Sequence, residues 1–285
     1  MSKRVDLEWD DTHALPLRLD LATSFVFQRM VEETFNAVGL YDQRARILDV
    51  GCGMGIDTRE MANNGHYLVG LEPSRIMLAK AREWLQGWGI KAYLVQGIGE
   101  DMPFKARSFD KTVCKGALDH FYDPEAAIKE IAGATKSTGR VIIAVTNYES
   151  LGCRLARIYI KIKHSLLNKR SSQRRPWEGY GKANTQPSPE LHCLLEQKKE
   201  ERYPWDPPAD HTFKFDYFVL KKALEKYLII ESVVGVSLFW NLPHWHSVLE
   251  RLPKAIAWSI LIVLDKIAAR LPIFSDVLVS RCRLK

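Results

Sequence analysis

Cysteine is scarce and unpaired in this chain of 285 residues. The five cysteines are scattered, odd in number, and never spaced as a Cys-x-x-Cys pair. Secreted domains held by disulfides and zinc-binding modules both depend on regularly spaced cysteines. The sequence therefore argues against a disulfide framework, favours a reducing compartment and predicts no metal site.

Long hydrophobic runs are also lacking. The longest, residues 255–264, is interrupted by Ser259 and is shorter than the roughly 20 residues that span a bilayer. The first six residues lack the apolar segment of a signal peptide. We therefore expect a cytoplasmic protein without a transmembrane segment. The apolar content of 46% and charged content of 26% are typical of a globular chain.

Acidic residues are missing from one long stretch, so much of the net charge of +7 is concentrated there. None lies between Glu149 and Glu178, whereas eight basic residues do. Residues 151–167 carry apolar side chains at spacings of three and four, which predicts a helix. We considered a solvated helix packed on the core, a helix at an anionic membrane surface, and a nucleic-acid-binding segment. The last is disfavoured because no recognised nucleic-acid module or aromatic stacking platform accompanies it.

The most informative stretch that is present is Ile-Leu-Asp-Val-Gly-Cys-Gly-Met-Gly at residues 47–55. An apolar strand, a glycine turn and a helix in this order bring bare backbone close to a ligand. The Gly-x-Gly-x-Gly spacing differs from the dinucleotide fingerprint, and Asp49 would repel a pyrophosphate. Glu72, which ends the next strand-like run, suits a ribose diol. Asp49 suits a ligand with a cationic end. A ligand that has a ribose and a cationic end but no phosphate fits S-adenosylmethionine (SAM).

Strand and helix patterns alternate from residue 47 to residue 146, which predicts a parallel sheet covered on both faces. Five further motifs follow the glycine loop in order along the chain, at 69–74, 97–104, 109–113, 118–124 and 139–143. Together these motifs resemble those of the class I SAM-dependent methyltransferases, especially the small-molecule group, over roughly residues 40–146. The resemblance implies an α/β, Rossmann-like, doubly wound sheet of seven strands. It would be mostly parallel, with an antiparallel last strand and helical cap insertions.

The resemblance also implies a cofactor site for SAM, with S-adenosylhomocysteine as the product. Gly51 and Gly53 would pack under the methionine part, and Asp49 would orient this loop or reach the amino group. Glu72 would hold the ribose hydroxyls, and Met77 would face the adenine. The expected cofactor-binding residues are Asp49, Gly51, Cys52, Gly53, Glu72, Pro73, Ser74, Met77, Ile98, Gly99, Glu100 and Lys115.

Two of these positions depart from the family pattern. Ile98 stands where related enzymes often have an aspartate that accepts from the adenine amino group. Isoleucine cannot accept, so this role would pass to Glu100, Asp101 or a backbone carbonyl. Lys115 is an unusual residue for a position that often contacts the cofactor.

Candidates for the chemistry follow the fourth expected strand. SAM carries an activated methyl group, so a general base is needed only where the acceptor must lose a proton. His120 is a candidate base and Tyr122 a candidate pocket residue. The alternative for this stretch is structural, because Asp123-Pro124 starts a helix. His211 matches another family position near the acceptor.

The sequence predicts one methyltransferase domain with two insertions. We expect an N-terminal helical lid at 1–46, the SAM-binding core at 47–146, an acceptor cap at 147–215, and C-terminal core strands at 216–285 that contain an apolar helical insertion at 239–275. A helix packed on the sheet is the alternative for the lid.

The second insertion combines three tryptophans with basic residues around the apolar run 255–264. This combination is typical of interfacial helices. With the basic stretch 151–175, residues 239–275 predict peripheral contact with the inner face of a membrane. The alternative is that these helices close a hydrophobic acceptor pocket or a subunit interface.

The sequence therefore predicts a methyltransferase that acts on a small lipophilic acceptor. The alternatives are an RNA or protein methyltransferase and a SAM-binding scaffold that transfers no methyl group. The acceptor, its reacting atom and the oligomeric state are left open.

Overall fold

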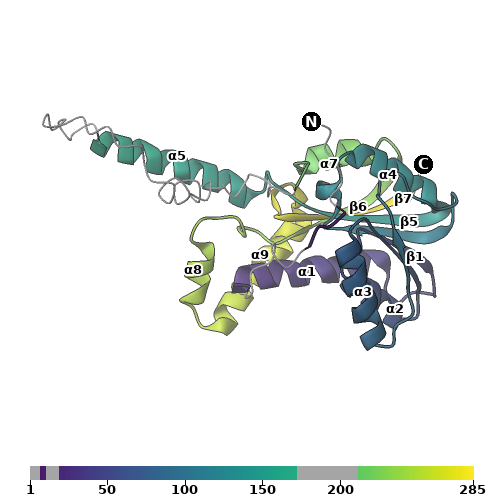
Figure 1. Ribbon diagram of the computed structural model, residues 1–285. Coiled ribbons are helices and arrows are strands. Elements are labelled where there is room, and N and C mark those ends of the chain that lie inside the picture. Colours follow the sequence, from purple (N-terminus) through teal and green to yellow (C-terminus); the bar gives the residue numbers. More distant parts are fainter. Residues whose placement is uncertain (1–6, 11–18, 172–210) are drawn as a thin grey trace, which may run out of the picture.

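The computed structural model describes residues 7–10, 19–171 and 211–285 (Figure 1). In this part of the chain the strands form one seven-stranded sheet of order β3-β2-β1-β4-β5-β7-β6. Strand β7 runs antiparallel to its neighbours β5 and β6, and the other pairs are parallel. The expected α/β fold is confirmed. The strands are β1 (Arg46–Val50), β2 (Tyr67–Glu72), β3 (Tyr93–Gln96), β4 (Phe109–Lys115), β5 (Thr135–Thr146), β6 (Leu228–Val236) and β7 (Val277–Leu284).

Helices cover both faces of the sheet, as parallel strands require. Local sequence explains where two of them begin. The Ser74 hydroxyl accepts from the Met77 backbone nitrogen at 3.2 Å, and Asp123 accepts from Ala126 at 3.0 Å. Both are N-cap hydrogen bonds. The helices are α1 (Leu21–Val38), α2 (Ile56–Asn63), α3 (Arg75–Gly87), α4 (Pro124–Ala134), α5 (Leu151–Ser171), α7 (Tyr217–Leu224), α8 (Trp245–Glu250) and α9 (Lys254–Arg270), with short 3-10 turns η2 (Leu118–His120) and η3 (Pro272–Phe274).

Strand β5 is longer than the sequence pattern indicates. Residues 136–139 look like the end of a helix, with the strand expected from residue 140, but α4 ends at Ala134 and β5 begins at Thr135. The Thr135 hydroxyl lies 2.7 Å from that of Thr112 on β4, and Lys136 pairs with Asp110 at 2.6 Å. These contacts between strands override the local helix-stop signal.

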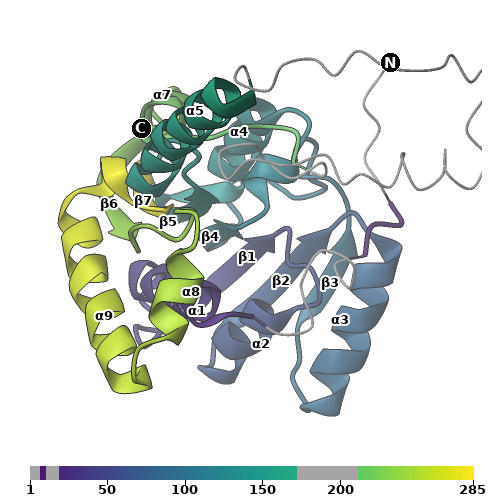
Figure 2. The same cartoon turned by 90° about the vertical axis from the view of Figure 1, so that its left-hand side faces the viewer.

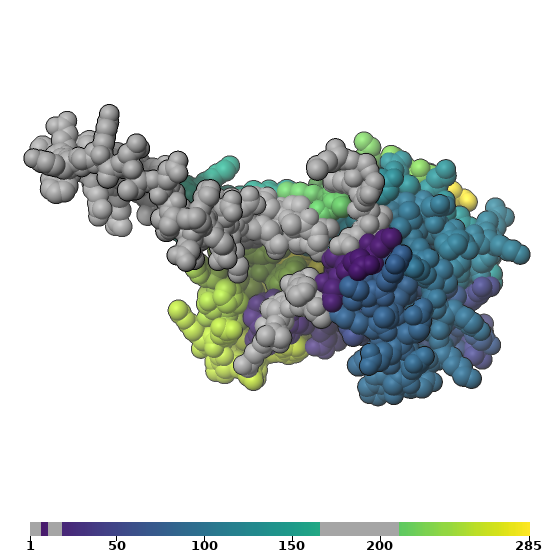
Figure 3. All heavy atoms as spheres, viewed as in Figure 1, coloured from purple at the N-terminus to yellow at the C-terminus, as the bar shows by residue number. Residues whose placement is uncertain are grey.

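The described part of the expected N-terminal lid comprises residues 7–10 and helix α1. Helix α1 packs on the sheet, where Val26 and Val38 share a buried cluster with Ile47 of β1 and Ile142 of β5. Residues 7–10 instead lie at the start of α3, where the Ser74 hydroxyl donates to the Trp9 carbonyl at 2.6 Å. Figure 3 shows this purple stretch against the blue surface of the α3 region. The remainder of the expected lid, residues 1–6 and 11–18, lies outside the described residues.

The two insertions meet on one side of the sheet. Helix α5 follows β5 and projects away from the domain, and α8 and α9 connect β6 to β7 (Figures 1 and 2). The Tyr159 hydroxyl of α5 lies 3.4 Å from Nε2 of His244, just before α8. The expected helix pair in the second insertion is confirmed, whereas residues 172–210 of the first lie outside the described part. None of the described helices has the length and apolar character needed to cross a bilayer.

Candidate cofactor and acceptor site

The glycine loop after β1 requires glycine for conformation and for space. Gly51, Gly53 and Gly55 have φ angles of 72°, 52° and 76°, a left-handed region that other residues rarely adopt. A Cβ on Gly51 would lie 2.4 Å from the Cβ of Ala117. The backbone nitrogens of Gly51 and Cys52 both donate to the Leu71 carbonyl. The loop therefore lies against the end of β2 on one side and the turn after β4 on the other.

Glu72 is buried at the end of β2, with 5% of its surface exposed. Its two carboxylate oxygens accept from the backbone nitrogens of Gly53 and Ser74, each at 3.0 Å. A carboxylate oxygen can accept more than one hydrogen bond, which is the chemistry that a ribose hydroxyl requires of this position. The position predicted to hold the ribose also supports the loop beside it.

Asp49 is buried beneath the glycine loop. The Thr58 hydroxyl of α2 donates to its carboxylate at 2.6 Å. Burial is the main reason why the pKa of Asp49 is raised to about 7, and the nearby charge of Asp57 adds to it. A cationic group such as the amino group of SAM would restore the ionised form.

The other expected cofactor residues take different positions around the loop. Met77 is buried, and its methyl group lies 3.6 Å from where a Gly53 Cβ would be. Lys115 is paired with Asp57 of α2 at 2.8 Å, so its charge neutralises an acid beside the site. Cys52 and Ser74 are buried, and Pro73 and Ile98 are half-buried.

The segment 97–104 supports the turn after β4. Glu100 accepts from the backbone nitrogen of Tyr122 at 2.9 Å. A Cβ on Gly99 would lie 2.6 Å from the ring of Phe121. The Tyr122 side chain is 55% exposed. Glu100 and Gly99 therefore fix the turn on which the candidate base His120 lies.

Asp119, His120 and His211 form one cluster at the end of β4. Nδ1 of His211 lies 3.1 Å from Oδ2 of Asp119 and 2.7 Å from the hydroxyl of Tyr148. The ring centroids of His120 and His211 are 4.3 Å apart, and the ring of Trp9 lies 5.8 Å from that of His120. The two expected histidines are brought together, and Tyr122 is not part of their cluster.

Backbone hydrogen bonds explain how His211 reaches this turn. The backbone nitrogens of Thr212 and Phe213 donate to the Asp119 carbonyl at 2.8 and 3.1 Å. The Thr212 hydroxyl also donates to the carbonyl of Phe121. The segment after residue 210 is thereby held along η2.

Sequence reasoning missed Asp119, Tyr148 and Trp9. Asp119 immediately precedes the candidate base His120, so its position in the sequence could have marked it as a site residue. Tyr148 follows β5 and Trp9 lies near the N-terminus. Neither sits in a motif, and only packing brings them to the cluster.

This cluster also has the composition of a metal site. Asp119, His120 and His211 each offer a ligand atom, and these atoms all lie within 4.8 Å of one another. Oδ1 of Asp119 is buried and has no hydrogen-bond partner. The sequence predicts no metal because spacing reveals only ligands that are close in the chain. These three residues can hold a cation, and they can equally form an acid–base cluster.

Comparison with known proteins agrees with the fold. Residues 48–143 match the family described as a methyltransferase domain. The chain is 32% identical over 133 residues to the ubiquinone biosynthesis O-methyltransferase of Vibrio vulnificus strain YJ016, covering 46% of this chain and 51% of that protein. These matches support a class I SAM-dependent methyltransferase domain at residues 48–143. SAM is the cofactor of this family, and the chain spans about half the length of the curated relatives it matches.

Solved structures share the fold at low identity. The PH0226 protein from Pyrococcus horikoshii OT3 superposes with a TM-score of 0.54 at 14% identity, covering 97% of this chain and 100% of that one. The YcgJ protein from Bacillus subtilis gives 0.51 at 15%, covering 90% and 99%. The [4+2]-cyclase SpnF gives 0.53 at 16%, covering 90% and 80%. A cyclase among these neighbours shows that the fold alone does not decide the reaction.

Proposed function

We propose that this methyltransferase moves the methyl group of SAM to a hydroxyl group of a small hydrophobic acceptor, close to a membrane surface. The contact between Asp119 and His211, 3.1 Å long, is the observation that carries this proposal. It lies beside the expected cofactor, because Gly51 of the glycine loop packs on Ala117 of the same turn. The similarity to a protein named as an O-methyltransferase supports an oxygen acceptor.

The hydrogen bonds of His211 suit the role of a general base. Nδ1 faces the carboxylate of Asp119 and the hydroxyl of Tyr148, and an anionic oxygen at this distance favours a proton on Nδ1. Nε2 then keeps its lone pair and can take a proton. The same logic orients the base in a Ser-His-Asp triad.

The proposed step balances without a further reactant. The acceptor oxygen attacks the methyl carbon, the bond from that carbon to the sulfonium sulfur breaks, and S-adenosylhomocysteine leaves. The hydroxyl proton passes to Nε2 of His211 and from there to solvent. His120, whose ring lies 4.3 Å from that of His211, is the second candidate for this proton.

An assay with isotopically labelled SAM tests the proposal. Purified protein is incubated with an extract of cellular lipids and small molecules, and separately with RNA and protein fractions. We expect label in a lipophilic small molecule. Label in RNA or protein identifies the other acceptor classes, and SAM binding without any labelled product identifies a scaffold.

A further inference from the structure

Helix α9 is apolar on more of its circumference than packing requires. Its inner side, with Ala257, Leu261 and Ala268, is buried, and it packs against Phe25 of α1 and Leu249 of α8. A surface helix normally has one apolar stripe that faces the core and a polar opposite side. The other side of α9 is not polar, and this departure needs a physical reason.

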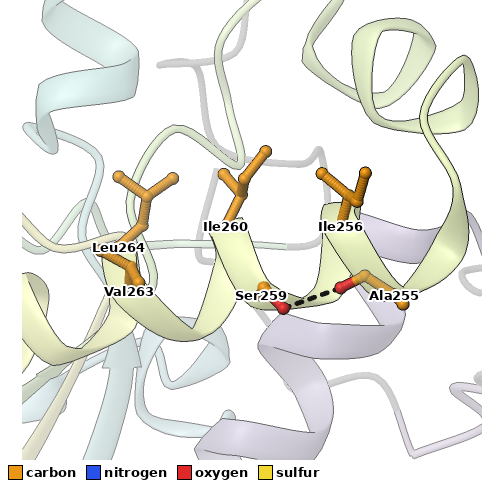
Figure 4. A pocket seen from close by; sticks show the side chains of 6 residues that line it. All are labelled: Ala255, Ile256, Ser259, Ile260, Val263 and Leu264. Atoms are coloured by element: carbon orange, nitrogen blue, oxygen red, sulfur yellow. Dashed lines mark hydrogen bonds between the residues drawn. The ribbon is translucent and has the colours of Figure 1, made fainter.

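The outer side of α9 carries a row of exposed aliphatic side chains. Ile256 is 51% exposed, Val263 57% and Ile267 42%. Figure 4 shows Ile256, Ile260 and Leu264 side by side on the helix, above Ser259 and Val263. With Ala255 they line an open hollow of about 460 Å³. We call Ile256, Ile260, Val263, Leu264 and Ile267 the outer face of α9.

The exposed charged side chains of α9 itself are all positive. Exposed Lys254 precedes it, and exposed Lys266 and Arg270 flank it one turn apart. Asp265 is the acidic residue of α9, and it is buried and paired with Arg29 of α1 at 2.8 Å. A surface that meets the outer face therefore meets positive charge at its rim.

Helix α5 repeats this combination on the same side of the molecule. Ile158 and Ile162 are 54% and 55% exposed, and Lys161 and Lys163 lie exposed beside them. The contact of Tyr159 with His244 places α5 against the second insertion. Figures 1 and 2 show α5, α8 and α9 at one end of the domain.

We propose that the outer face of α9, together with the exposed side of α5, docks on the surface of an anionic lipid bilayer. Exposed aliphatic side chains would enter the boundary between headgroups and acyl chains, and the lysines and arginines would meet the negative headgroups. A second copy of the chain fits less well, because two identical basic rims would face each other and repel. This surface is separate from the methyl-transfer site and does not depend on it.

Co-sedimentation with vesicles tests the proposal. The full chain is mixed with vesicles of phosphatidylcholine alone or with added phosphatidylglycerol. We expect binding to the anionic vesicles that weakens as salt is added. The double variant Ile256→Asp, Val263→Asp should lose at least tenfold in vesicle affinity. Tyr41→Asp, at a turn side chain that is 89% exposed, should not.

The positive charges beside the outer face are tested by two variants and a control. Lys266→Ala and Arg270→Ala should each weaken binding about fivefold, whereas Lys91→Ala, at an exposed site near β3, should have no effect. Thermal unfolding and SAM binding should match those of the parent in every variant.

Three outcomes would overturn the proposal. The intact chain fails to bind anionic vesicles, or the double aspartate variant binds as well as the parent. Alternatively, light scattering shows a dimer that the same variant converts to a monomer without vesicle binding, which assigns the face to a second copy. The labelled-SAM assay described above, run in parallel without vesicles, separates failure of docking from failure of the proposed methyl transfer.

Discussion

The carboxylate of Glu72 accepts a hydrogen bond from the backbone nitrogen of Gly53 at 3.0 Å. The residue predicted to hold the ribose therefore also supports the glycine loop that would pack under the methionine part of SAM. One side chain reaches both places because β1 and β2 are parallel neighbours that end at the same edge of the sheet.

Replacing Glu72 should weaken both the binding of SAM and the support of the glycine loop. We expect Glu72→Ala to weaken SAM binding at least tenfold, because hydrogen bonds to a charged group contribute about 1.5–3 kcal/mol. It should also lower the free energy of unfolding by about 1–3 kcal/mol, because the nitrogens of Gly53 and Ser74 lose their acceptor. Calorimetric titration and chemical denaturation measure the two effects. Glu83→Ala, at an exposed acid on α3, is the control, and unchanged affinity in Glu72→Ala would contradict the ribose assignment.

The pH dependence of SAM binding should report the state of Asp49. Burial raises the pKa of Asp49 to about 7, so the unliganded protein binds this proton up to neutral pH. If the ionised carboxylate meets the amino group of SAM, affinity should rise about tenfold between pH 6 and pH 8. Below pH 7, binding should release a proton, which titrations in buffers of different ionisation enthalpy detect.

The same raised pKa affects stability with the opposite sense. The folded state holds the Asp49 proton more tightly than the unfolded state, so the unliganded protein should lose stability as the pH rises from about 4 to about 7. Asp49→Asn cannot titrate and is the control for both effects. A pH dependence that persists in this variant would assign it to another group.

A comparison of Gly51 with Gly65 distinguishes the two reasons why a position requires glycine, which are a positive φ angle and lack of space for a Cβ. Both have positive φ angles, but a Cβ on Gly65 would meet nothing within 4 Å, whereas one on Gly51 would lie 2.4 Å from the Cβ of Ala117. Gly65→Ala should cost about 1–2 kcal/mol of stability from backbone strain alone. Gly51→Ala should cost about 2–5 kcal/mol, because overpacking adds to that strain. Equal losses in thermal unfolding would show that the loop moves aside.

The pair of Asp119 and His211 should control methyl transfer to a hydroxyl acceptor. We expect His211→Gln to lower kcat by about 10²–10⁴-fold, because the acceptor hydroxyl loses the side chain that takes its proton. Asp119→Asn should lower kcat while SAM affinity is unchanged, because the orientation of the imidazole is lost. His246→Gln, at an exposed site before α9, is the control.

A chelator distinguishes the base from a metal ligand at this cluster. Activity that survives EDTA while His211→Gln is impaired supports the base. Activity that EDTA abolishes and a divalent ion restores would assign Asp119, His120 and His211 to a metal instead.

The local structure around the glycine loop could be predicted because its signals are consecutive in the chain. A buried strand, a glycine turn and a helix start are consecutive in residues 47–55, and the left-handed angles there admit little but glycine. Asp49 and Glu72 could be placed because parallel strands end at one edge of a sheet. The boundaries of β5 could not, because the pairing of Thr135 with Thr112 depends on a strand elsewhere in the chain.

The sequence by itself determined the α/β fold and the kind of cofactor, since both follow from dihedral preference, burial pattern and charge over short stretches. Only the tertiary structure decided that α1 packs on the sheet and that Trp9, Asp119, Tyr148 and His211 meet. It also decided that the outer face of α9 stays uncovered in the described chain. These outcomes depend on which distant surfaces come into contact, and that depends on the packing of the whole sheet and its helices.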